Sequence, residues 1–98
     1  MQLKWTELAD ADLESIEAHI SEANSPTIAI DVVMNIIDSV QLILPEHPKA
    51  ARQGRVKNTR ELVVDGLAFI VIYREQLNEG RIEILRVLHH AQQWPKAD

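Results

Sequence analysis

The stretch ELVVDGLAFIVIY, residues 61–73, decides the fold. Two runs rich in β-branched and apolar residues flank Asp65-Gly66, a dipeptide that favours a two-residue hairpin turn. The second run, residues 67–73, is almost wholly apolar, which is typical of a central strand covered on both faces. The sequence therefore predicts a β-hairpin whose second strand lies inside a sheet.

Further strands are predicted on both sides of this hairpin. Residues 2–5 alternate between polar and apolar side chains, and residues 81–88 form a last strand after a turn over residues 75–80. Because the later strands are joined by short turns, we expect an antiparallel sheet. On the last strand, simple alternation places Ile82, Ile84 and Leu88 on one face, and Leu85 and Val87 on the other.

Two helices are predicted between the first strand and the hairpin. Thr6 is suited to cap the first helix, in which apolar residues recur at spacings of three and four. Ser25 and Pro26 are suited to begin the second helix, and Pro45 ends it. Few residues join the helices, so they should pack as an antiparallel hairpin. The fold class is therefore α+β: one domain over residues 1–98, in the order β-α-α-β-β-β, with an antiparallel sheet packed against an N-terminal helical hairpin.

Charge is distributed unevenly along the chain. Residues 1–48 carry nine acidic side chains and one basic one, whereas residues 49–98 carry nine basic and six acidic ones, and the net charge is −5. Five basic residues lie in or beside a loop predicted over residues 49–58: Lys49, Arg52, Arg55, Lys57 and Arg60. Either these charges only solvate the surface, or the basic loop meets an acidic partner. The acidic total excludes a uniformly basic nucleic-acid binder.

The composition also excludes several kinds of site. The chain has no cysteine, and none of its four histidines has a partner at helical metal-ligand spacing, so we expect no metal. Three glycines cannot build a phosphate-binding loop, and we expect no cofactor. No apolar run approaches the ~18 residues of a membrane span, and residues 1–14 lack the features of a signal peptide. We therefore expect a cytoplasmic protein with no membrane partner.

Several motifs resemble one bacterial family. The segments TRELVV (59–64), VIYR (71–74) and IEILRVLHHAQQWP (82–95) are similar to those of the ParE/RelE toxins of type II toxin–antitoxin modules. WTELADADLESI (5–16) and the stretch from Pro48 to Arg55 extend the resemblance over nearly the whole chain. The family fold agrees with the order β-α-α-β-β-β, which periodicity alone predicts.

The resemblance implies a toxin that stabilises plasmids and is neutralised by an antitoxin encoded in the same operon. The antitoxin would lay an amphipathic or extended segment across the helical hairpin and the sheet edge. RelE-like members of the family cut mRNA on the ribosome, whereas ParE-like members poison DNA gyrase and have no established hydrolytic site. The first would be an enzyme, and the second an inhibitory binding protein.

The strand residues favour the ParE-like branch. Metal-free RNA cleavage needs a base, an acid and several cations around the phosphate. Beyond Arg60 the same strand offers only apolar residues from Leu62 to Val64, and Ile70 stands where RelE carries an arginine. We therefore expect a gyrase inhibitor without catalytic turnover and without sequence-specific nucleic-acid binding of its own. Two alternatives stay open: a RelE-like mRNA interferase, and a non-toxic member that acts only in antitoxin complexes and operon regulation.

Candidate site residues follow from these alternatives. A metal-independent nuclease would use Arg60, Tyr73, Arg86 and either His89 or His90; adjacent residues on a strand point to opposite faces, so only one histidine could join. Partner binding is predicted for Arg52, Arg55, Lys57, Arg60, Tyr73, Arg74 and Trp94. Tyr73 is alternatively a packing residue with its hydroxyl at the rim, Arg86 a paired core arginine, and Trp94 a lid on the core edge.

Overall fold

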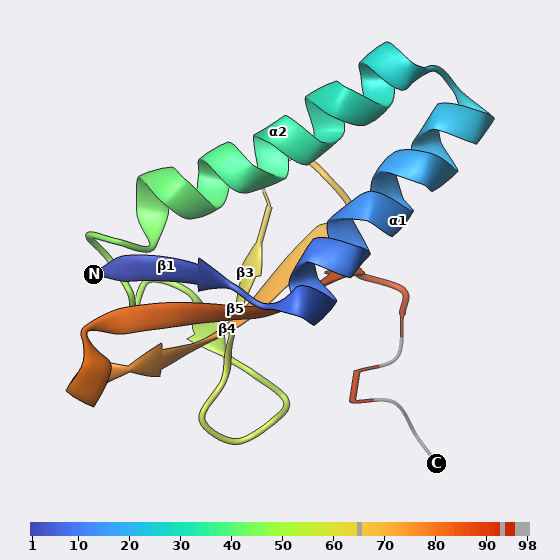
Figure 1. Cartoon of the computed structure of the whole chain (residues 1–98). Coiled ribbons are helices and arrows are strands. Elements are labelled where there is room, and N and C mark those ends of the chain that lie inside the picture. Colours follow the sequence, from blue (N-terminus) through green and yellow to red (C-terminus); the bar gives the residue numbers. More distant parts are fainter. Residues whose placement is uncertain (65, 93, 96–98) are drawn as a thin grey trace.

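Two long antiparallel strands form the centre of the molecule. In the computed structural model, which describes residues 1–64, 66–92 and 94–95, β4 (Phe69–Gln76) pairs with β5 (Arg81–His89). On the far side of β4 lie β3 (Arg60–Val63) and the two-residue β2 (Arg52–Gln53); β1 (Gln2–Trp5) lies beside β5. The resulting order is β1-β5-β4-β3-β2 (Figure 1). A 3₁₀ turn, Leu77–Glu79, joins the central strands.

The two helices cover one face of this sheet, as predicted. The Thr6 hydroxyl accepts a hydrogen bond from Ala9 N–H and begins α1 (Glu7–Ala23), and the Ser25 hydroxyl does the same for α2 (Pro26–Ile43). These bonds satisfy amide groups that a helix N-terminus otherwise leaves unpaired. Figure 1 shows α1 and α2 as an antiparallel pair above the strands.

The main core lies between the helices and the sheet. Ile36, Val40 and Leu44 are fully buried there, against Val71, Tyr73, Ile82, Ile84 and Val87 from the strands. Each buried aliphatic side chain contributes about 1.5–3 kcal/mol to folding. By length and a mean hydropathy of 1.4, α2 also matches a membrane span, a property that the core helices of globular proteins share.

A β-bulge corrects the predicted faces of the last strand. Tyr73 pairs with Ile84 and Ile72 pairs with Arg86, which leaves Leu85 as an extra residue on β5. The alternation of side chains shifts at that point. Val87 therefore joins the main core, and Leu88 joins Ile70, Ile72, Leu85 and Trp94 in a second cluster on the opposite face.

The α+β class is confirmed, and three local expectations are corrected. The sheet is mixed because β1 pairs in parallel with β5. The short turns between the later strands give no information about this contact between distant parts of the sequence. Asp65 lies outside the described residues; the hairpin connection is longer than two residues, since the Val64 amide bonds to the Phe69 carbonyl. Within the predicted basic loop, Arg52 and Gln53 form β2.

Candidate partner-binding cleft

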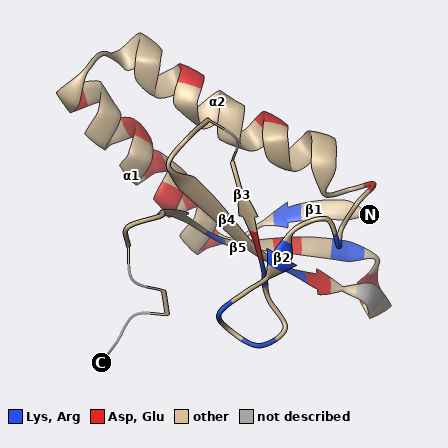
Figure 2. Cartoon of the chain, turned by 180° about the vertical axis from the view of Figure 1, so that it is seen from behind, with Lys and Arg blue, Asp and Glu red and all other residues tan. Residues whose placement is uncertain are grey.

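The basic loop forms one wall of a cleft of ≈ 560 Å³. The ends of β3 and β4 form the other wall. Four cationic side chains line the cleft, Lys49, Lys57, Arg60 and Arg74, together with the carboxylate of Glu75. Figure 2 shows this basic region below the helices, whose charged residues are all acidic. The described cleft is therefore a local positive surface on an acidic chain.

Tight backbone contacts fix the shape of the loop. The Gly54 amide donates to the Thr59 carbonyl at 2.8 Å, and the Thr59 hydroxyl donates to the Val56 carbonyl at 2.6 Å. A Cβ at Gly54 would overlap Thr59 Oγ1, so a larger residue there would displace the threonine. Asn58 has φ of 67°, a left-handed conformation that asparagine tolerates better than most residues.

Glu61 anchors the loop from beneath. Its side chain is 1% exposed. The carboxylate accepts hydrogen bonds from the Arg55 amide at 2.8 Å and from the guanidinium groups of Arg55 and Arg52. Burial raises the pKa of the Glu61 carboxyl, but these hydrogen bonds outweigh burial and hold the pKa below its ordinary value. Arg52 and Arg55 remain largely exposed, so each can hold the loop and still meet a partner.

A second carboxylate, Glu75, lies within the cleft. It bridges Lys49 Nζ and Arg60 Nε, each at 3.3 Å, and Arg60 also donates to the Ala51 carbonyl at 2.9 Å. Arg74 bonds instead to Glu83 at 2.7 Å. Hydrogen bonds from Gln76 and Arg74 lower the pKa of the Glu83 carboxyl. Two of the lining cations therefore share one internal anion.

Tyr73 is a core residue, which corrects its prediction as a partner contact. Its side chain is 0% exposed, and its hydroxyl donates to the Pro48 carbonyl at 2.7 Å rather than reaching the rim. Burial raises the pKa of this hydroxyl. Because Tyr73 is enclosed, it supports the cleft from within by holding Pro48, next to Lys49.

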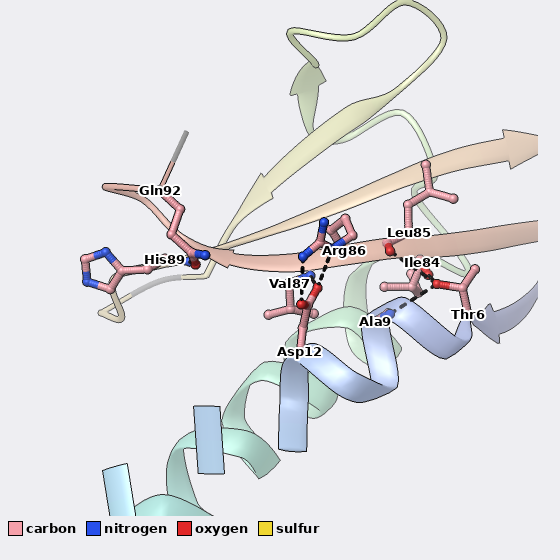
Figure 3. A network of polar contacts seen from close by, with 9 residues as sticks. All are labelled: Thr6, Ala9, Asp12, Ile84, Leu85, Arg86, Val87, His89 and Gln92. Carbon is pink, nitrogen blue, oxygen red and sulfur yellow. Dashed lines mark hydrogen bonds and ion pairs between the residues drawn. The ribbon is translucent and has the colours of Figure 1, made fainter. Parts of the chain in front are cut away.

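The residues predicted for a nuclease do not converge. Arg60 lies opposite Tyr73 in the middle of β4, whereas His89 lies opposite Phe69 at the first residue of that strand, about 13 Å away along it. Arg86 is held by Asp12 of α1 through two bonds, at 2.8 and 2.9 Å (Figure 3). That carboxylate raises the pKa of Arg86, so the guanidinium stays charged and paired. The arrangement does not surround one phosphate with a base, an acid and cations.

Comparison with known proteins identifies the family of this chain. The family model described as "ParE toxin of type II toxin-antitoxin system, parDE" matches residues 3–94. The chain belongs to the ParE toxin family. A curated relative from Sinorhizobium fredii, named "Putative toxin Y4kP", is 40% identical over 95 residues, which cover 97% of this chain and 94% of that protein.

Solved structures are also similar to this ParE-family chain. The structure "Chromosomal ParDE TA system from P. aeruginosa" matches with a TM-score of 0.82 and 29% identity, covering 91% of this chain and 95% of that one. The RelBE2 toxin–antitoxin complex from Mycobacterium tuberculosis matches with a TM-score of 0.58 and 19% identity, covering 93% and 92%. The second likeness concerns the fold alone.

The histidine pair of the ParE-family chain differs from its prediction. The rings of His89 and His90 stack, with centroids 4.6 Å apart, instead of pointing to opposite faces. The prediction was wrong because β5 ends at His89: the chain turns there, and the Gln92 amide donates to the His89 carbonyl. Among the described residues, no cluster of three or more histidines and carboxylates could hold a metal ion.

Trp94 covers the second cluster of the ParE-family chain. It packs against Ile70, Ile72 and Leu88, and the Arg86 guanidinium lies 5.8 Å from the centre of its ring. Trp94 therefore packs as a lid on the core edge, which is the second of its two predicted roles. Arg86 is likewise the paired arginine that was predicted as an alternative to a nuclease residue. Trp94 lies away from the basic cleft, so the predicted partner residues do not form one continuous set.

Sequence reasoning missed Glu75 as a member of the cleft. A usable signal was present, because pairing Arg60 with Tyr73 places residue 75 just beyond the start of β3, beside the basic loop. Lys49 was counted among the bases, but it was not predicted to bind a partner. Its ion pair with Glu75 now places it at the cleft.

Proposed function

We propose that this ParE-family toxin inhibits DNA gyrase by binding it, without catalytic turnover. The observation that carries the proposal is the family match over residues 3–94, on a structure in which the nuclease candidates lie apart. A binding protein needs a shaped surface rather than a convergent acid and base. Such a toxin acts in the cytoplasm, and its module would stabilise a plasmid that carried it.

The direct test measures supercoiling of relaxed plasmid DNA by purified gyrase as toxin is added. We expect supercoiling to fall while mRNA in a parallel ribosome reaction stays intact. Premixing the toxin with its antitoxin should restore supercoiling. Intact supercoiling with cut mRNA would instead establish an interferase. If both supercoiling and mRNA stay intact, and cells grow normally after the toxin is induced, the protein is a non-toxic member.

A matched variant separates binding from cleavage. His89→Gln removes the imidazole of an exposed residue that sits far from the basic cleft. The proposal expects inhibition of supercoiling by this variant to equal that of the unmodified toxin. An interferase that uses His89 would lose at least tenfold in cleavage, because a general acid or base contributes about 10²–10⁴ in rate.

We further propose that the antitoxin covers an apolar face of α2. Ile30 and Met34 are about half exposed and lie one turn apart, with Val33 and Ile37 half-buried beside them. This spacing of three and four suits an amphipathic partner segment. The matched solved structure described as a ParDE system, which is 29% identical, supports an antitoxin partner.

A charge introduced on this face of α2 tests whether the antitoxin docks there. Met34→Lys should weaken antitoxin binding at least tenfold in calorimetric titration, because a docked apolar contact is replaced by a desolvated charge. Leu8→Lys on α1 is the control, since Leu8 is also exposed but lies near the start of the other helix. Equal affinities for the two variants would place the antitoxin elsewhere.

A further inference from the structure

We propose that the basic cleft binds a short acidic peptide segment, and that Glu75 occupies the cleft in the free toxin as an internal substitute for a peptide carboxylate. The proposal rests on the antitoxin proposed above, whose acidic segment would be the occupant. It assigns the recognition chemistry to named residues: Lys49, Lys57 and Arg60 would bind the peptide, and Glu75 would give way to it.

The ion pairs of the cleft differ in length. Arg74 meets Glu83 at 2.7 Å, within the range of a strong charge-assisted hydrogen bond. Both contacts of Glu75 are longer, 3.3 Å to Lys49 and 3.3 Å to Arg60, and the Lys49 side chain is 67% exposed. Lys49 is therefore held loosely, whereas Arg60 is fixed by its 2.9 Å bond to the Ala51 carbonyl and makes only a long contact with Glu75. An incoming carboxylate can replace Glu75 at both cations without breaking the bond that positions Arg60.

The walls of the cleft are already ordered in the free protein. Glu61 fixes the loop through the Arg55 amide, and Gly54 closes it against Thr59. Lys57 sits on that fixed loop and lines the cleft. A site whose walls are ordered before binding loses less conformational entropy when the ligand arrives.

The contacts and charges around the cleft favour a peptide over a nucleic acid. The group that Lys49 and Arg60 already hold is a carboxylate, so the geometry is suited to a carboxylate. The helical half of the chain is strongly acidic, which repels a long polyanion but leaves room for a short one (Figure 2). A peptide can deliver its charge to the cleft without running past the helices.

The test compares two short polyanions by fluorescence anisotropy, labelled octaglutamate and a labelled oligothymidylate of the same length. We expect octaglutamate to bind the full-length toxin more tightly, and its affinity to fall as salt is added. Lys57→Ala should weaken this binding roughly threefold, the effect of one exposed charge pair. Tighter binding of the oligothymidylate would overturn the proposal in favour of a nucleic-acid site.

The decisive variant is Glu75→Gln, which frees both cations while keeping the shape of the side chain. It should raise the affinity for octaglutamate roughly three- to tenfold, because the internal competitor is gone. Glu14→Gln, on the exposed surface of α1, changes the net charge equally and should leave the affinity within about twofold. Equal gains in the two variants would overturn the internal-substitute role, because net charge alone would then explain them.

Failure here is distinguishable from failure of the proposed function. The peptide measurement uses the toxin alone, whereas inhibition of gyrase is read from DNA supercoiling. A thermal melt of Glu75→Gln shows whether the variant is folded. If it melts more than a few degrees below the unmodified toxin, Lys49→Met tests the same contact from the other side, with an expected loss of binding. Unchanged octaglutamate binding by a folded Lys49→Met would overturn the proposal.

Discussion

The same strands form two faces of the sheet that differ in construction. Beneath α1 and α2, Val71 and Ile84 are enclosed in an apolar core. On the opposite face, neighbouring positions carry Glu61 and Arg74, each tied to an opposite charge, beside a smaller apolar cluster that Trp94 covers. The difference separates two tasks: close packing stabilises the fold, and ion pairs hold a surface that a partner can still reach.

The largest effect is expected from a substitution in the core beneath α1 and α2. Ile36→Ala removes a fully buried side chain of α2 and should lower the free energy of unfolding by about 2–5 kcal/mol. Urea titration followed by circular dichroism measures this loss. Leu42→Ala is the control, because Leu42 is 77% exposed on the same helix, and it should stay within about 0.5 kcal/mol. Similar losses for both would contradict the assignment of the core.

The next effect breaks the link between α1 and β5. Asp12 accepts two bonds from Arg86 and one from the Val87 amide, all between 2.8 and 2.9 Å. Asp12→Asn should cost about 1.5–3 kcal/mol, since it removes the charge from these hydrogen bonds. Urea unfolding measures the cost, and Glu14→Gln on α1 should cost less than about 0.5 kcal/mol. Equal costs would show that Arg86 gains nothing from Asp12.

The same substitution on both faces sharpens the comparison. Val71→Thr places a hydroxyl in the main core and should cost about 1–3 kcal/mol, because no water remains to solvate it. Val63→Thr places the same group where the side chain is half exposed and should stay within about 0.5 kcal/mol. The difference between their unfolding midpoints is the measured quantity. No difference would mean that the two faces are equally hydrated.

The smallest expected effect concerns the loop anchor on the open face. Because the pKa of the Glu61 carboxyl is lowered in the folded protein, its contribution to stability is complete above its ordinary pKa of 4.5 and is lost as pH falls through the lowered value. Glu61→Gln should therefore cost about 1–2 kcal/mol at neutral pH and less in acid. Unfolding midpoints measured from neutral pH into the acid range show how stability changes with pH. If stability depends on pH equally in the variant and in the unmodified protein, Glu61 does not anchor the loop.

Local patterns predicted most of the fold, because they depend on neighbours in the sequence. Thr6 and Ser25 cap the helices as expected, and residues 69–73 form the core of a central strand. The bulge at Leu85 was not predictable, since alternation contains no sign of an extra residue. The parallel partner of β1 was also missed, because Leu3 meets Ile82 only through the whole intervening fold.

The site was predicted less completely, for a related reason. The cluster of bases at Lys57 and Arg60 is visible in the sequence, and it does line a cleft. What each base touches depends on strand pairing: Glu61 meets the loop where β3 pairs with β2, and Glu75 meets Arg60 where β4 pairs with β3. Tyr73 looked accessible at a strand end, but the returning chain at Pro48 encloses it.

The parallel pairing of β1 with β5 has a consequence for synthesis. Because Leu3 pairs with Ile82, the sheet cannot close until residues 81–89 have left the ribosome. At about 5–20 residues per second, that wait lasts about 4–15 s. In the part of this interval that follows synthesis of α2, its apolar side, including Ile36 and Val40, has no strands to cover it. Until the sheet closes, these apolar side chains are accessible to any partner that is already present, such as an antitoxin.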